Sequence, residues 1–180
     1  MLNRSKRKTN AKADEVFSSI KKQLQNIDSE IALEYLTWLD RKTAYLNQSI
    51  NKLGYGAQPD NLSRGDVVWV EFGINVGTEL SDYKTHGHYA LVWAIDLGNV
   101  VVIPLSSRDA PGSLLTFDLG IIEGLNDKNE NAHSFLKLDA IRSVSKRRIA
   151  RMNGQDTGKI TLQDEMIEKV KRAIEMAFLN

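Results

Sequence analysis

The sequence predicts an α+β protein, in which a helical segment precedes a small antiparallel β domain that ends in a helix. Residues 13–53 contain no Gly or Pro, and their apolar side chains recur at helical spacing. From Asp66 onward the apolar period falls to two, which is typical of strands. Helical spacing returns after Thr161. These three segments and their periods define the expected architecture.

The first segment carries two apolar stripes at helical spacing. Asp28 or Ser29 is placed to cap a second helix, so we expect a helical hairpin. One long kinked helix is the alternative. The preceding residues 1–12 hold five basic side chains and no acid, and we expect a flexible basic tail. The stripes consist of Val16, Phe17, Ile20 and Leu24, and of Ile31, Tyr35, Trp38, Leu39, Leu46, Ile50 and Leu53.

Short β segments dominate the second part of the chain. Gly and Pro residues at 54–62 predict a linker, so the domains are expected at 13–53 and 63–180. Leu97-Gly98-Asn99 is a tight-turn signal that predicts an antiparallel hairpin, and the polar residues 123–132 predict a loop. Many short strands favour a small barrel or sandwich over βαβ units. The expected strands are 66–72, 88–95, 100–105, 115–119, 134–138 and 140–144.

The chain is expected to close with an amphipathic helix. Thr161 and Asp164 have the spacing of a capping box at its start. Its apolar stripe is expected to be buried and contains Met166, Ile167, Val170, Ile174, Ala177 and Phe178.

Composition excludes several classes of protein. The chain has no cysteine, which excludes disulfides, cysteine nucleophiles and Cys-ligated zinc. It has no apolar run long enough for a transmembrane helix and no secretory signal pattern, so we expect a cytoplasmic protein without membrane contact. It contains no nucleotide-binding or hydrolase-elbow motif, and His86-Gly87-His88 lacks a third ligand at a familiar spacing. We therefore expect neither a cofactor nor a metal.

Positive charge is concentrated in a chain whose net charge is only +1. Residues 137–151 contain six basic side chains and a single acid, Asp139. Such a cluster is typical of a surface that binds a polyanion, and it is also compatible with an ordinary solvated face.

Three segments in order resemble the MazF/PemK family of toxins. They are Arg64-Gly65-Asp66-Val67-Val68-Trp69-Val70 followed by Gly77-Thr78-Glu79, the hairpin that ends in Ile103-Pro104-Leu105-Ser106-Ser107, and the stretch from Leu136 to Ile149. The resemblance covers about residues 63–179. It implies an SH3-like β-barrel with a C-terminal helix, usually as a homodimer. It also implies a metal-independent endoribonuclease that cuts single-stranded RNA through the substrate's own 2′-hydroxyl, restrained by an antitoxin.

The resemblance assigns the expected catalytic residues. The family's hydroxyl at the end of the hairpin falls on Ser106, with Ser107 as a second choice, and its acidic loop residue falls on Glu79. The family's catalytic arginine, usually followed by proline, falls on His88, which Tyr89 follows. Histidine exchanges protons near neutral pH, and His86 is expected to share this work because residues i and i+2 of a strand face the same side.

The basic residues are candidates for holding RNA phosphates. We expect Arg142, Lys146, Arg147 and Arg148 to neutralise phosphates along one edge. Lys84 and Arg108 lie in loops near the expected groove. Tyr83 and Tyr89 could stack on a base, although packing is the favoured role for Tyr89, while Trp69 and Trp93 are expected in the core.

An alternative follows from the missing arginine–proline pair. A catalytically inactive module of the same fold would use the same groove to bind a partner protein or a nucleic acid, RNA or DNA. DNA binding within an autoregulatory complex is a further hypothesis. The helical segment lies outside the resemblance, and it could serve dimerisation, pack on its own barrel, cover the groove or recruit a partner.

Overall fold

The computed structural model describes residues 2–77, 79–125 and 131–179, with side chains from residue 10 onward. The chain divides into two compact units, Met1–Ala44 and Tyr45–Asn180. This division falls inside the second helix, whereas the sequence predicts a linker at 54–62. The domain bounds at 53 and 63 stay a prediction.

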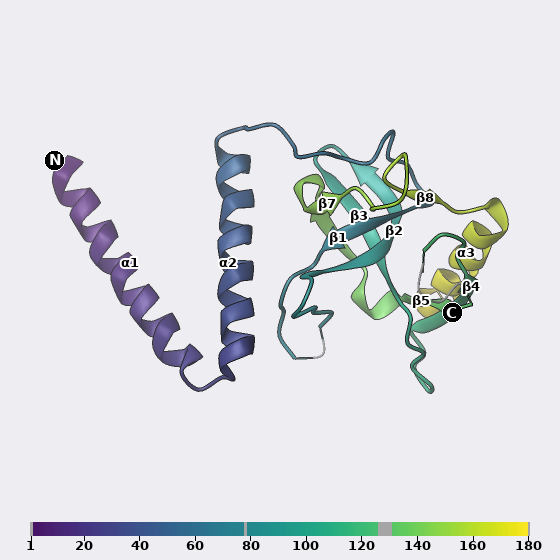
Figure 1. Cartoon of the computed structure of the whole chain (residues 1–180), viewed down its shortest axis with the longest axis horizontal. Helices are drawn as coiled ribbons and strands as arrows, with labels where there is room; N and C mark the ends of the chain where they lie inside the picture. Colours follow the sequence, from purple (N-terminus) through teal and green to yellow (C-terminus); the bar gives the residue numbers. More distant parts are fainter. Residues whose placement is uncertain (1, 78, 126–130, 180) are drawn as a thin grey trace. The chain divides into compact units, whose positions relative to one another are not determined.

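Two antiparallel helices open the chain (Figure 1). α1 spans Leu2–Leu24 and α2 spans Ser29–Ile50, so the hairpin is present in place of one long helix. Asp28 caps the N-terminus of α2, because its Oδ1 accepts hydrogen bonds from the backbone N–H groups of Glu30 and Ile31. α1 is helical from Leu2, where the sequence predicts a flexible tail.

The first unit contains an apolar groove between its two helices. The groove has a volume of about 610 Å³, and its lining includes Phe17, Ile20, Leu24, Leu36 and Leu39. Several of these side chains are partly exposed to solvent, with Phe17 exposed by 65%. Among the helices that the structure describes, none combines the length and apolar character that a membrane span requires.

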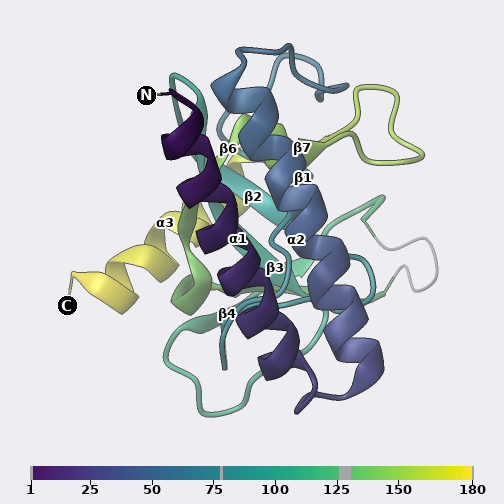
Figure 2. The ribbon, with the colours of Figure 1, turned by 90° about the vertical axis from the view of Figure 1, so that its left-hand side faces the viewer.

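The second unit contains an antiparallel sheet, and eight of its strands lie within the described residues (Figures 1 and 2). The hydrogen-bonded order is β4-β5-β3-β2-β1-β7, while β6 pairs with β3 and β8 pairs with β1. The strands are β1 Asp66–Glu71, β2 Gly87–Asp96, β3 Asn99–Ser106, β4 Thr116–Ile121, β5 His133–Lys137, β6 Arg142–Ser145, β7 Ile149–Ala150 and β8 Ile160–Thr161. Short 3-10 helices η1 (Leu138–Ala140) and η2 (Lys146–Arg148) flank β6.

The predicted α+β class and the order of helices, antiparallel sheet and final helix are confirmed. The hairpin is present, because Asp96 of β2 pairs with Asn99 of β3 across the turn. The predicted loop at 123–132 falls partly on residues 126–130, which lie outside the described residues.

Apolar side chains pack on both faces of the central strands. Along β1, Val67 joins the core cluster that packs against the final helix, while Val68 and Val70 join a second cluster on the opposite face. This alternation follows from the period of two along a strand. β2 and β3 contribute to both clusters in the same way, with Leu91 and Ile103 in the first cluster and Ala90 and Val102 in the second.

The final helix α3 spans Asp164–Phe178, and the predicted capping box is absent. Gln163 is the N-cap residue and makes no side-chain cap hydrogen bond. The Thr161 hydroxyl instead donates to Asp66 at 2.7 Å, because β8 pairs with β1 and brings the two side chains together. Val170 is buried as predicted, whereas Phe178 at the end of the stripe is 52% exposed.

Candidate functional site

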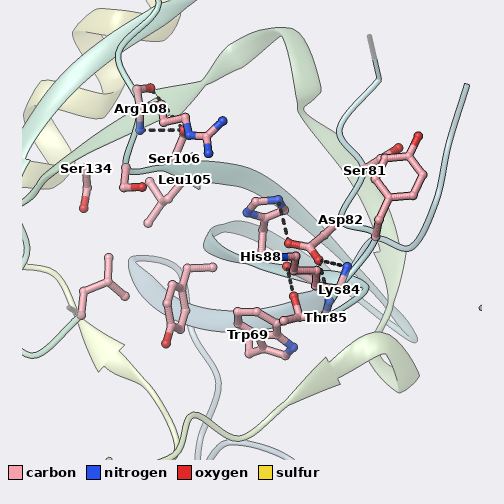
Figure 3. A pocket seen from close by; sticks show the side chains of 15 residues that line it. Trp69, Ser81, Asp82, Lys84, Thr85, His88, Leu105, Ser106, Arg108 and Ser134 are labelled. Atoms are coloured by element: carbon pink, nitrogen blue, oxygen red, sulfur yellow. Dashed lines mark hydrogen bonds and ion pairs between the residues drawn. The ribbon is translucent and has the colours of Figure 1, made fainter. Parts of the chain in front are cut away.

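A pocket of about 690 Å³ opens where β2 begins and β3 ends (Figure 3). The long connection between β1 and β2 forms one wall, and the segment after β3 forms another. The lining residues are Trp69, Ser81, Asp82, Tyr83, Lys84, Thr85, Gly87, His88, Tyr89, Leu105, Ser106, Ser107, Arg108, Leu125 and Ser134. Polar and cationic side chains thus meet aromatic and aliphatic ones in a single hollow.

His88 lies in the middle of this pocket (Figure 3). Its backbone pairs with Val70 of β1, so the strand register holds the imidazole at the start of β2. The side chain is 31% exposed, and its Nε2 lies 3.7 Å from Oδ2 of Asp82. Burial lowers the pKa of His88 below its ordinary value of 6.5, while the Asp82 carboxylate and a hydrogen bond with the Ser81 backbone oppose this effect.

The residue before His88 has to be glycine. A Cβ atom on Gly87 would lie 2.7 Å from the indole ring of Trp69. The absence of a side chain lets the Trp69 ring pack against the start of β2. Trp69, which the sequence predicts as core, is therefore half-buried and lines the pocket.

Ser106 faces His88 from the end of β3. Its backbone pairs with Phe135 of β5. Its hydroxyl accepts a hydrogen bond from the Arg108 backbone N–H at 2.9 Å and donates to the Arg108 carbonyl at 3.2 Å. This turn sets Ser107 and Arg108 at the rim of the same pocket.

The connection between β1 and β2 carries Asp82 into the pocket. Asp82 Oδ1 accepts hydrogen bonds from the backbone N–H groups of Lys84, at 2.8 Å, and of Thr85, at 2.5 Å. Burial raises the pKa of Asp82, but the hydrogen bonds from Thr85 and Lys84 and the nearby His88 outweigh it and lower the pKa below its usual value. Asp82 is therefore ionised at neutral pH.

Three aromatic side chains also line the pocket. The rings of Trp69 and Tyr89 meet edge to face, with their centroids 5.1 Å apart. Tyr83 is 43% exposed and lines the pocket from the connection. Trp93 does not line the pocket. The guanidinium of Arg64 lies over its ring, with Cζ 3.8 Å from the ring centroid.

Two predicted catalytic residues are absent from the lining. His86 is 4% exposed and has a φ of +59°, so it is not extended and β2 begins only at Gly87. The extended backbone on which the shared orientation of His86 and His88 was expected is therefore absent at His86. Glu79 is exposed, and its described hydrogen bonds are those of its own backbone, with Val76 and Ser81.

The predicted basic residues divide into two groups. Lys84, Ser107 and Arg108 line the pocket, whereas Arg142 and the residues of η2 do not. We call Arg142, Lys146, Arg147 and Arg148 the basic edge.

Two guanidinium groups of the basic edge are bound to backbone carbonyls. Arg147 donates to the carbonyls of Leu53 and Gly54 at 2.6 and 2.8 Å, and its guanidinium lies over the Tyr55 ring at 4.5 Å. Arg148 donates to the carbonyls of Glu71 and Phe72 at 2.6 and 2.7 Å. Burial lowers the pKa of Arg148, and the nearby Arg142 lowers it further.

Sequence reasoning missed Asp82 and the neighbouring Thr85. The sequence signal for this turn is an aspartate at its first position. The Asp82 side chain accepts the N–H groups two and three residues later, which is typical of a turn. That signal predicts a turn and gives no indication of His88, because the folded connection alone brings the two side chains together. Within the described part of the chain, no group of three or more His, Asp or Glu residues has the arrangement of a metal site.

The arrangement suits chemistry on an anion that bears an apolar group. Lys84 and Arg108 supply positive charge, Ser106 supplies a hydroxyl, and His88 exchanges a proton near neutral pH. Residues 63–178 match the model of a protein family described as PemK-like, MazF-like toxin of type II toxin-antitoxin system. This match covers more than half of the chain. No curated protein matches the chain.

Proposed function

Because this chain belongs to the PemK-like, MazF-like toxin family of type II toxin-antitoxin systems, we propose that it is an endoribonuclease that cuts single-stranded RNA without a metal ion. The main support for this proposal is that His88, Ser106 and Arg108 line one pocket. The resemblance assigns two of these positions to the family's catalytic arginine and hydroxyl. Arg108 adds a permanent positive charge beside them.

RNA cleavage requires little covalent chemistry from the protein. The substrate's 2′-oxygen forms a bond to phosphorus, its proton moves to the His88 imidazole, and the bond from phosphorus to the 5′-oxygen breaks. The departing 5′-oxygen takes a proton from solvent, and His88 later releases its own proton. The products are a 2′,3′-cyclic phosphate and a 5′-hydroxyl end, and no protein nucleophile is consumed.

Each pocket residue has a role in this scheme. The Ser106 O–H exchanges its present acceptor, the Arg108 carbonyl, for a phosphate oxygen. Arg108 and Lys84 stabilise the negative charge that develops there. His88 acts as a base because burial lowers its pKa and keeps the imidazole neutral at pH 7. Trp69, Tyr83 and Tyr89 provide aromatic surface for an unstacked base.

The partners proposed for the chain follow from the family. We propose a cognate antitoxin as its inhibitor and a homodimer as its working form. DNA binding within an autoregulatory complex and action in the cytoplasm are proposed on the same basis. The competing hypothesis is an inactive module that binds a protein or a nucleic acid, and the replacement of the family's arginine by His88 favours it.

Cleavage of a mixed-sequence single-stranded RNA in EDTA tests the proposal. The parent chain is expected to cut, and the His88→Ala and Ser106→Ala chains are expected to cut about 100- to 10,000-fold more slowly. Lys169→Ala is the matched control, because Lys169 is exposed on α3 and lies outside the pocket. A folded parent chain that leaves the RNA intact in EDTA would contradict the proposal and favour the inactive module.

A further inference from the structure

The two carboxylate oxygens of Asp82 have different contacts (Figure 3). Oδ1 accepts the backbone N–H groups of Lys84 and Thr85. Oδ2 lies 3.7 Å from Nε2 of His88. One oxygen therefore holds the turn together, and the other presents negative charge to the imidazole.

Backbone contacts at the base of the connection fix Asp82 independently of His88. The Asp82 backbone N–H donates to the Gly73 carbonyl at 3.2 Å, and the Gly73 N–H donates to the His86 carbonyl at 2.7 Å. The Thr85 hydroxyl donates to the Gly87 carbonyl at 3.2 Å. These bonds tie the turn to the end of β1 and to the start of β2.

Other charged and titratable groups share the pocket with His88. The cations Lys84 and Arg108 disfavour a positive imidazole, and Tyr83 and Tyr89 contribute phenol groups to the same lining. Burial acts in the same direction as the two cations. Among the described residues that line the pocket, Asp82 is the one carboxylate, and it favours the positive form.

We propose that Asp82 is a positioning residue for His88, which orients the imidazole and stabilises the imidazolium that forms when His88 takes a proton. This inference rests on the proposed function for the reaction in which the proton is taken. It goes beyond the family resemblance, because the resemblance puts an arginine, which needs no partner to hold its charge, at this position. A histidine at the same place requires an anion to support the charged state.

The variant Asp82→Asn separates the two roles of the side chain. The amide oxygen of asparagine can still accept the N–H groups of Lys84 and Thr85, so the turn is retained. The negative charge that faces His88 is lost. Asp109→Asn is the matched control, because Asp109 also accepts a backbone N–H, from Ala110 at 2.7 Å, but is exposed and does not line the pocket.

Titration of His88 in the full-length chain by NMR tests the inference without any need for activity. We expect Asp82→Asn to move the His88 pKa downward, while Asp109→Asn leaves it unchanged. The amide shifts of Lys84 and Thr85 report whether the turn is kept. A His88 pKa that is equal in the parent and in Asp82→Asn, with the turn kept, would overturn the inference.

Cleavage kinetics provide the second readout. In Asp82→Asn, kcat is expected to fall about tenfold with KM unchanged, since general-base catalysis as a whole contributes about 100- to 10,000-fold. An unchanged kcat would overturn the positioning role even if the pKa moves. A parent chain that does not cut RNA would overturn the proposed function, while the titration would still decide whether Asp82 controls the charge of His88.

Discussion

The pocket and the basic edge both gather positive charge, but the two regions use it differently. On the basic edge, Arg147 and Arg148 each donate to two backbone carbonyls. In the pocket, no ion pair of the described residues engages Lys84 or Arg108. A cluster of basic residues in a sequence therefore indicates a ligand-binding surface only where backbone carbonyls do not already accept the donors.

This difference has a physical origin in the guanidinium group. Its planar fork of N–H donors can bind two carbonyls at once, which ties separate segments of backbone together. Arg148 uses this fork on Glu71, the last residue of β1, and on Phe72, which follows it. Arg148 therefore stabilises the fold near the pocket without lining it.

The largest expected effect concerns the stability of the basic edge. Arg148→Ala leaves the carbonyls of Glu71 and Phe72 without these charge-assisted hydrogen bonds, so we expect the free energy of unfolding to fall by about 2–4 kcal/mol. Arg108→Ala is the matched variant in the pocket and should change stability by less than about 0.5 kcal/mol. Urea unfolding of both chains measures the two values. Equal losses would remove the distinction between the regions.

The next effect concerns RNA affinity, measured with an RNA whose 2′-hydroxyls are blocked. Arg108→Ala is expected to weaken binding about tenfold and to reduce the slope of log affinity against log salt by about 0.7. Lys84→Ala should have a similar but smaller effect. Lys146→Ala on the basic edge should change neither quantity. A larger loss in Lys146→Ala than in Arg108→Ala would show that RNA follows the basic edge.

The smallest effect is the pH dependence of cleavage near neutrality. Burial lowers the pKa of His88 below 6.5, so the imidazole is already neutral at pH 7. Since a base must be neutral to act, log(kcat/KM) should rise with unit slope at low pH and become flat above the lowered pKa. Measurements from pH 5 to 8 check this. A rate that falls from pH 6 to pH 8 would mean that His88 acts as an acid.

The periodic parts of the fold were predictable from the sequence. Val67, Val68 and Val70 alternate between two core clusters, and the Leu97-Gly98-Asn99 turn joins β2 and β3. These elements depend on local spacing and on burial, which the order of apolar residues records.

Features that depend on distant contacts were not predictable. The Thr161 hydroxyl binds Asp66, 95 residues away, although local spacing suggested a helix cap. His86 has a left-handed backbone that its alternation with His88 did not indicate. At the candidate site, the resemblance indicated His88 and Ser106, while Asp82 was found only through the folded connection between β1 and β2.

The closed base of that connection bears on how far its length can vary. Gly73 receives the Asp82 N–H on its carbonyl and donates its own N–H to His86, so both ends of the segment are pinned beside the strands. Changes of length at the exposed part of this segment, next to Val76 and Gly77, are therefore expected to leave the imidazole of His88 in place.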